Sequence, residues 1–110
     1  MAHYIVTGSY TAAGMKGMLA KPSDREKAAR AILEASGAKL RSFLLTTGDT
    51  DFSMIIEAPE IGDVMAGLIV VGASGAVTNL KTVQAFTADE FRSAQKKAGE
   101  LTANYKAPNA

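Results

Sequence analysis

The side chains with which this chain could do chemistry are few, and most of them interrupt apolar, strand-like segments. His3, the single histidine among 110 residues, lies just before the strand-like run that begins at Tyr4. An imidazole at such a place can act as a general base beside a cavity. The alternative is a solvated residue at the edge of a sheet. One histidine and no cysteine exclude a histidine cluster or a thiolate site, so no metal is predicted.

A pair of carboxylates, Asp49 and Asp51, flanks Thr50 between two strand-like segments. Two such groups can hold a hard cation through oxygen ligands. Asp side chains also bond to nearby backbone N–H groups and favour tight turns, and this is the preferred interpretation for Asp49. Asp51 begins a strand, where it is a candidate for ligand binding or for a buried hydrogen-bond network.

Aromatic and basic side chains supply the remaining candidates. Tyr4, Gly8 and Tyr10 share one face of a strand, where two rings beside a glycine can frame a pocket for a flat ligand. Packing against a helix explains the two tyrosines equally well. Arg41 and Glu57 are predicted to form an ion pair across a hairpin, and the alternative for Arg41 is a substrate carboxylate.

The first part of the chain supplies the strand that carries the tyrosines. A β-branched and aromatic run predicts a strand over Tyr4–Tyr10, and the glycines of Thr11–Lys21 indicate a loop or a broken turn of helix. Ser23 and Glu26 form a capping-box pattern that begins a helix, which Gly37 ends in a left-handed conformation.

A β-hairpin is predicted to carry the carboxylates. Its strands are Lys39–Thr47 and Asp51–Ala58, and they fold back about Gly48–Asp49. In the second strand large apolar residues alternate with others, which places one set on the core side of a sheet. The predicted core set is Phe52, Met54 and Ile56, and the opposite set is Asp51, Ser53, Ile55 and Glu57.

Two further helices and a strand complete the chain. Pro59 favours the start of a helix that ends at Gly72–Gly75. A strand follows over Val77–Phe86, and the capping-box pattern Thr87–Glu90 begins a C-terminal helix. Residues 106–110 are predicted to form a frayed tail. The expected core stripe of the first helix is Ile61, Val64, Met65 and Leu68. On the second helix Phe91, Ala94, Ala98, Leu101 and Tyr105 share one apolar face.

The element order β-α-β-β-α-β plus a helix is the ferredoxin-like pattern. It predicts one α+β domain over residues 1–110 with a four-stranded antiparallel sheet. Right-handed crossovers place both main helices on the same face of that sheet. The other face then carries uncovered apolar residues such as Ile5 and Ile55. Because a monomer rarely leaves such a patch in water, a homodimer with its sheets face to face is predicted, and higher assembly stays open.

Composition excludes several classes of partner. The chain is 47% hydrophobic and 21% charged with a net charge of +1, which gives no electrostatic basis for binding nucleic acid or an anionic membrane. Its longest apolar run, near Met65–Val71, is far shorter than a membrane span, and the N-terminus lacks the pattern of a secretory signal. A cytoplasmic protein without a cofactor is predicted.

Short segments of the predicted strands and helices follow one another in a distinctive order. They are Tyr4-Ile-Val, Ala28-Ala29 before Gly37-Ala-Lys-Leu, Phe43-Leu-Leu-Thr-Thr-Gly48, Asp51-Phe52, Glu57-Ala-Pro59 and Thr82-Val-Gln-Ala-Phe-Thr87. In this order and spacing the chain resembles the GYD family of bacterial proteins. The family's Gly-Tyr-Asp motif is incomplete here, because Asp49 and Thr50 lie between Gly48 and Asp51 with no tyrosine.

The resemblance implies the dimeric α/β-barrel architecture, in agreement with the element order. Relatives by fold include cofactor-independent monooxygenases and other small-molecule enzymes. The family itself brings no established activity, and a shared fold does not define a function.

Two functional hypotheses follow. The first is a homodimer that binds a small molecule and is a candidate cofactor-independent enzyme, with its pocket between the sheet and the helices or at the dimer interface. Asp51, Tyr4, Tyr10 and His3 are expected to line that pocket, and at least two of them to converge in it. The second hypothesis is a structural or interaction module without catalytic activity, which requires a filled core and an extended assembly surface.

Overall fold

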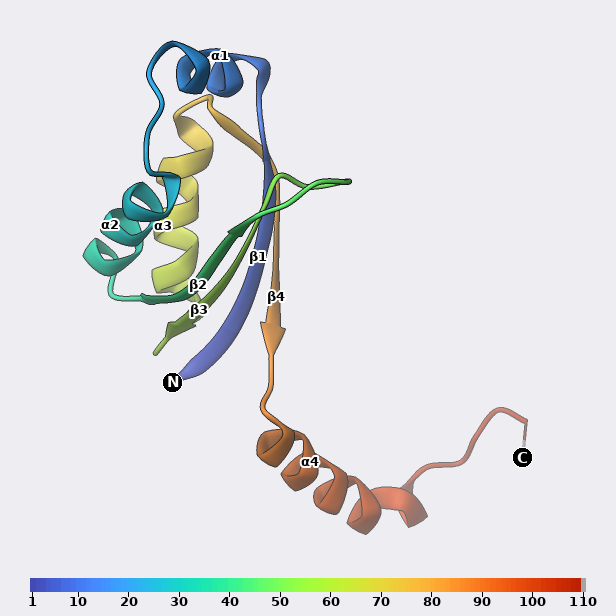
Figure 1. Cartoon of the computed structure of the whole chain (residues 1–110). Helices are drawn as coiled ribbons and strands as arrows, with labels where there is room; N and C mark the ends of the chain where they lie inside the picture. Colours follow the sequence, from blue (N-terminus) through green and yellow to red (C-terminus); the bar gives the residue numbers. More distant parts are fainter. Residues whose placement is uncertain (110) are drawn as a thin grey trace.

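A single antiparallel sheet with helices packed on one side forms the body of the protein (Figure 1). The computed structural model describes residues 1–109. Within them the strands are β1 (Ala2–Tyr10), β2 (Lys39–Leu45), β3 (Phe52–Ala58) and β4 (Val77–Ala85). The helices are α1 (Ala12–Ala20), α2 (Arg25–Ala35), α3 (Ile61–Ala73) and α4 (Ala88–Leu101), followed by a 3₁₀ turn at Thr102–Asn104.

The predicted α+β order is confirmed for the body. The strands lie in the order β2-β3-β1-β4, and each neighbouring pair runs antiparallel. α2 and α3 cover the same face of the sheet (Figure 1). The arrangement is consistent with the ferredoxin-like pattern, in which both crossovers are right-handed. The strand boundaries agree with the predicted ones to within about two residues, the usual scatter of strand ends.

The segment expected to be a loop or a broken turn forms a regular helix, α1. Thr11 caps it, because its Oγ1 accepts a hydrogen bond from the Gly14 N–H at 3.0 Å. The same hydroxyl donates to the Gly75 carbonyl at 2.7 Å, and the Thr11 N–H donates to the Ala76 carbonyl at 2.9 Å. The N-cap and these tertiary bonds outweigh the low helix propensity of the glycines in this segment.

The N-cap of α2 is Asp24, and the prediction of Ser23 was wrong. Asp24 Oδ1 accepts a hydrogen bond from the Lys27 N–H at 3.0 Å, whereas Ser23 Oγ accepts one from Arg25 Nη1 at 2.9 Å. Both residue types favour N-caps, so propensity alone does not choose between neighbours. Gly37 follows the helix with a φ of +98°, as predicted.

α3 begins at Ile61, two residues after the predicted start at Pro59, and it turns only part of the predicted stripe to the core. Val64 and Gly67 are buried and Leu68 packs against the core, whereas Ile61 is 47% exposed and Met65 is 51% exposed. The helix is apolar on nearly every side, so its sequence indicates no single stripe. Packing decides the face instead, because Gly67 allows Leu33 of α2 to approach closely.

The core lies between the sheet and the layer formed by α2 and α3. Phe52, Met54 and Ile56 are buried, which confirms the predicted core side of β3. Val6 of β1 and Leu33 of α2 belong to the same buried cluster. Complete burial of an apolar side chain of this size contributes about 1.5–3 kcal/mol, so this layer dominates the stability of the body.

The opposite face of the sheet, called the open face below, carries no packed helix within residues 1–109 (Figure 1). The strand register aligns Ile55, Ile5 and Val83 in one row across β3, β1 and β4. Ile55 is 40% exposed and Val83 is 57% exposed. The predicted apolar patch around Ile5 and Ile55 is therefore present, and Val83 extends it.

α4 stands apart from the body. Its predicted capping box is present: Thr87 Oγ1 accepts from the Glu90 N–H at 3.1 Å, and Glu90 Oε1 accepts from the Thr87 N–H at 2.8 Å. The helix projects beyond the end of β4 on the side of the open face (Figure 1). The Cα radius of gyration is 18.1 Å, against about 13 Å for a compact chain of this length. Every residue of α4, including those of its predicted apolar face, is exposed in the described chain.

The end of the chain follows the 3₁₀ turn. Residues 106–109 form no helix or strand, and residue 110 of the predicted frayed tail lies outside the described residues. Over residues 1–109 no helix combines the length and the apolar character that a membrane crossing requires.

Candidate functional site

A cleft opens between α1, α2 and α3, near the residue at which β1 ends. Its outer part has a volume of about 700 Å³ and extends under α1. An inner recess of about 90 Å³ lies between the helices and the sheet. Both parts are lined by Tyr10, Arg25, Ala28, Ile32, Val71 and Val77. This space, defined by those residues, is called the helix-side cleft.

Aromatic rings form the sheet-side wall of the recess. The Phe52 ring is stacked on the Phe43 ring, with centroids 6.2 Å apart, and is tilted against the Tyr10 ring at 5.4 Å. Gly8 leaves the space for Phe52, since a Cβ atom at Gly8 would lie 2.5 Å from Phe52 Cζ. The wall is therefore flat and apolar, which suits a planar ligand.

Arg25 and Tyr10 bring polar atoms to this apolar wall. Arg25 is the first residue of α2 and lines both parts of the cleft. Burial raises the pKa of the Tyr10 hydroxyl, and the nearby Arg25 guanidinium partly offsets that effect. Tyr10 therefore keeps its proton at neutral pH and can donate a hydrogen bond, while Arg25 supplies a permanent positive charge.

Asp51 fixes the backbone at Tyr10. Its Oδ2 accepts a hydrogen bond from the Tyr10 N–H at 2.9 Å, and its own N–H donates to the Gly8 carbonyl at 2.8 Å. Tyr10 and Asp51 also share a shallow hollow with Met15 and Met18 of α1. The structure thus gives Asp51 a positioning contact to the residue that carries the phenol.

Asp49, the other acidic residue of the pair, lies in the hairpin turn and is held there through its backbone. Gly48 adopts a φ of +99°, and the Asp49 carbonyl accepts a hydrogen bond from Ser9 Oγ at 3.4 Å. Thr50, which stands where the family tyrosine is missing, accepts through its carbonyl a hydrogen bond from Thr46 Oγ1 at 2.7 Å. Among residues 1–109 no group of three or more His, Cys, Asp or Glu side chains is placed to hold a metal ion.

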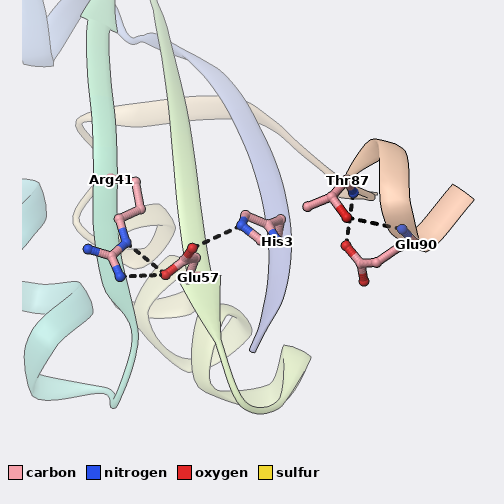
Figure 2. A network of polar contacts seen from close by, with 5 residues as sticks. All are labelled: His3, Arg41, Glu57, Thr87 and Glu90. Atoms are coloured by element: carbon pink, nitrogen blue, oxygen red, sulfur yellow. Dashed lines mark hydrogen bonds and ion pairs between the residues drawn. The ribbon is translucent and has the colours of Figure 1, made fainter.

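A second polar cluster, called the charged row, consists of His3, Glu57 and Arg41 on the open face (Figure 2). His3 Nε2 lies 2.9 Å from Glu57 Oε1, and Arg41 Nε and Nη2 each lie 2.7 Å from Glu57 Oε2. The predicted ion pair between Arg41 and Glu57 is confirmed. The hydrogen bond from Arg41 is the main cause that lowers the pKa of Glu57.

The charged row lies next to the start of α4. Figure 2 shows Thr87 and Glu90, the capping box of that helix, on the His3 side of the row. His3 Nδ1 is buried and has no hydrogen-bond partner among the described residues. The imidazole is therefore oriented through one nitrogen alone, by Glu57.

The five predicted site residues lie in three different places. Tyr10 lines the helix-side cleft and meets Asp51 in the shallow hollow beside it, whereas His3 and Arg41 belong to the charged row on the other face. Tyr4 is buried in the core and does not line the cleft. Alternation along β1 explains the separation, because His3 and Tyr4 are neighbours that point to opposite faces of the sheet.

Sequence reasoning missed Arg25, which stands inside the capping-box pattern and was interpreted only as part of a helix start. The available signal was its place in the first turn of a helix that follows a Pro-containing loop. A residue there lies at the end of the helix layer, where a long basic side chain can reach over the edge of a strand.

The protein is a small α+β domain with a ferredoxin-like sheet, one uncovered sheet face and an apolar cleft on the helix side. Domains of this class perform many different functions. The chain belongs to the GYD domain family, because the family model matches residues 4–94. The predicted resemblance is thereby confirmed, and the match ends inside α4. A search of curated proteins found no match. The bacterial origin and the cytoplasmic location stay predictions.

Proposed function

We propose that this protein is a homodimer that binds a small planar organic anion in the helix-side cleft of each copy. The observation that carries the proposal is that Arg25 and Tyr10 line an otherwise apolar recess. A carboxylate or similar oxyanion is the group that a guanidinium and a phenol hydroxyl recognise together. The wall of Phe52 and Phe43 accommodates the flat body of such a ligand.

The dimer in this proposal joins the open faces of two copies about a two-fold axis. The row of Ile5, Ile55 and Val83 supports it, because a second sheet would remove these side chains from water. The helix-side cleft lies on the other face of the same sheet. Dimer formation therefore leaves both clefts accessible to ligand.

The cleft is also suited to acid catalysis without a cofactor. A protonated phenol beside a bound anion can donate its proton to an atom that gains negative charge during a reaction. Tyr10→Phe keeps the ring and removes that proton. A catalytic role for Tyr10 predicts that Tyr10→Phe abolishes turnover of a ligand while changing its affinity by no more than about tenfold.

The test of binding uses two matched probes, 1-naphthoate and its neutral amide 1-naphthamide, with titration calorimetry. Naphthoate is expected to bind about 10–100-fold more tightly, since a hydrogen bond to a charged partner contributes about 1.5–3 kcal/mol. Arg25→Gln should remove this preference. Arg41→Gln, which removes a similar charge from the open face, should retain it. Equal affinities for the two probes, or no binding of either, would contradict the proposal.

A structural or interaction module is the second candidate, and it is favoured by the apolar surfaces that one chain leaves uncovered on the open face and on α4. Native mass spectrometry of gently purified protein separates the two candidates. A dimer that carries extra mass of a small acidic compound supports the ligand-binding function. A dimer without extra mass that also fails to bind naphthoate supports the module.

A further inference from the structure

α4 is a helix without a supporting surface in one copy of the chain. Its 14 residues are all exposed in the described structure, including Phe91 at 60% and Leu101 at 53%. A helix of about 12–15 residues is marginally stable in water by itself. The capping box of Thr87 and Glu90 adds only about 1 kcal/mol. The remaining stability of α4 has to come from packing against another surface.

One side of α4 is shaped for such packing. Phe91, Ala94, Ala98 and Leu101 follow one another at alternating spacings of three and four, and the exposed Tyr105 continues the series. This spacing gives the narrow apolar seam with which a helix packs along one partner surface. Lys96 and Glu100 lie on the opposite side and keep that side polar.

The direction of α4 indicates where its partner surface lies. Two residues, Phe86 and Thr87, join it to the end of β4, and the helix then runs away from its own body on the side of the open face (Figure 1). The molecule consequently extends over 61 Å in its longest direction. The space beside the open face is the space that a second copy occupies when two sheets meet.

We infer that α4 is an exchanged arm, whose seam of Phe91, Ala94, Ala98 and Leu101 packs against the second copy of this chain. The inference rests on the proposed homodimer and adds a distinct interface to it. A two-fold axis that joins the open faces also carries each α4 alongside the other copy. One symmetric assembly thereby covers both apolar surfaces that a single chain exposes.

The area of the interface supports a second copy as the occupant. A four-stranded face with strands of about seven residues covers roughly 450 Å² per copy, from the spacing and rise of β-strands. A stable dimer buries about 800 Å² of accessible surface per partner, which exceeds the flat outline of the open face. A helix of about 20 Å by 10 Å has an outline of roughly 200 Å². Each copy gives one helix and receives one, so the exchange adds roughly 400 Å² per copy. With the arm the interface reaches the usual size.

The first experiment compares two double variants of α4 by sedimentation equilibrium. Phe91→Ser with Leu101→Ser removes the two large side chains of the seam. Lys96→Ser with Glu100→Ser changes two residues on the opposite side without changing the net charge. The seam variant is expected to raise the dimer dissociation constant by about tenfold or more, and the control to leave it within about threefold of the wild type. Since α4 contributes no buried residue, circular dichroism should show a folded body in both variants.

The second experiment identifies the copy that α4 contacts. Mixed dimers of isotope-labelled and unlabelled chains are examined for nuclear Overhauser effects between the Phe91 ring and the other copy. Effects between copies are expected. If the wild-type dimer shows Overhauser effects of Phe91 only within one chain, the exchanged arm is wrong. It is also wrong if the seam variant dimerises as tightly as the control variant. Either result leaves the proposed homodimer unaffected. A wild-type monomer overturns both.

Discussion

At the scale of single residues, Glu57 is the acceptor shared by His3 and Arg41 on the open face. The hydrogen bond from Arg41 lowers the pKa of Glu57 below its ordinary value of 4.5. A carboxyl group whose pKa is lower in the folded chain than in the unfolded chain stabilises the fold above the unfolded value. That contribution disappears as the pH falls through the lowered value.

Glu57→Gln is therefore expected to flatten the loss of stability below about pH 4.5, because an amide has no proton to gain. The measurement is the urea midpoint of unfolding from about pH 7 to about pH 3. Glu100→Gln, a change at an exposed carboxylate on α4, serves as the control and should follow the wild-type curve. A Glu57→Gln curve parallel to that of the wild type would show that the ion pairs do not contribute.

Gly8 offers a test of the aromatic wall. A Cβ at this position would lie 2.5 Å from Phe52 Cζ and 2.9 Å from Leu80 Cδ2, so Gly8→Ala has to displace both side chains. Overpacking of this kind costs about 1–3 kcal/mol. Gly17→Ala on α1 is the matched control, since nothing lies within 4 Å of its added Cβ. It should be neutral or stabilise the protein by up to about 1 kcal/mol. Equal urea midpoints for the two variants would contradict this account of the wall.

At the scale of elements, the agreement between sequence and structure depends on how much information each pattern contains. β3 alternates large apolar and other residues, so its core side could be predicted from Phe52, Met54 and Ile56. α3 lacks such contrast, and the face it buries depends on the close approach of Gly67 to Leu33. Ser23 and Asp24 are both good caps, so residue type alone does not choose between them.

The candidate site shows the same dependence on tertiary packing. Tyr10 is predictable as a ring that shares a strand face with Gly8, and Asp51 as a carboxylate at the start of a strand. Arg25 could not be placed from the sequence, since the residues that line the recess with it come from all four strands and from α3 as well as α2. Likewise, the separation of His3 from Tyr10 follows from β1 being the central strand, with a helix layer on one face and none on the other.

The capping box makes α4 testable as an element. Thr87→Ala removes the hydroxyl that accepts from the Glu90 N–H, and it should destabilise the first turn by about 1 kcal/mol. The expected result is about fivefold faster amide hydrogen exchange at Glu90 and Phe91. Thr87→Ser keeps the hydroxyl and should exchange like the wild type. Unchanged exchange in Thr87→Ala would mean that packing alone holds this end of the helix.

At the scale of the whole molecule, the open face and the helix-side cleft are opposite sides of one sheet. Ile55 lies at one end of the apolar row but on an inner strand of the sheet, so Ile55→Asp would place a charge within a sheet-to-sheet interface. The variant is expected to sediment as a monomer, since burying an unpaired charge is strongly unfavourable. Leu19→Asp on the exposed side of α1 is the control and should remain a dimer. A dimeric Ile55→Asp variant would place the interface elsewhere.

The central position of β1 also has a consequence for synthesis on the ribosome. Its hydrogen-bonded neighbours are β3 and β4, and the partner of His3 on β4 is Ala85, about 80 residues further along the chain. At a rate of about 5–20 residues per second, the strand made first waits on the order of 4–16 s for its last partner. The middle of the sheet is thus the earliest part to be translated and among the last to be completed. During that interval the nascent chain exposes an apolar strand with both edges free, the kind of segment that chaperones bind.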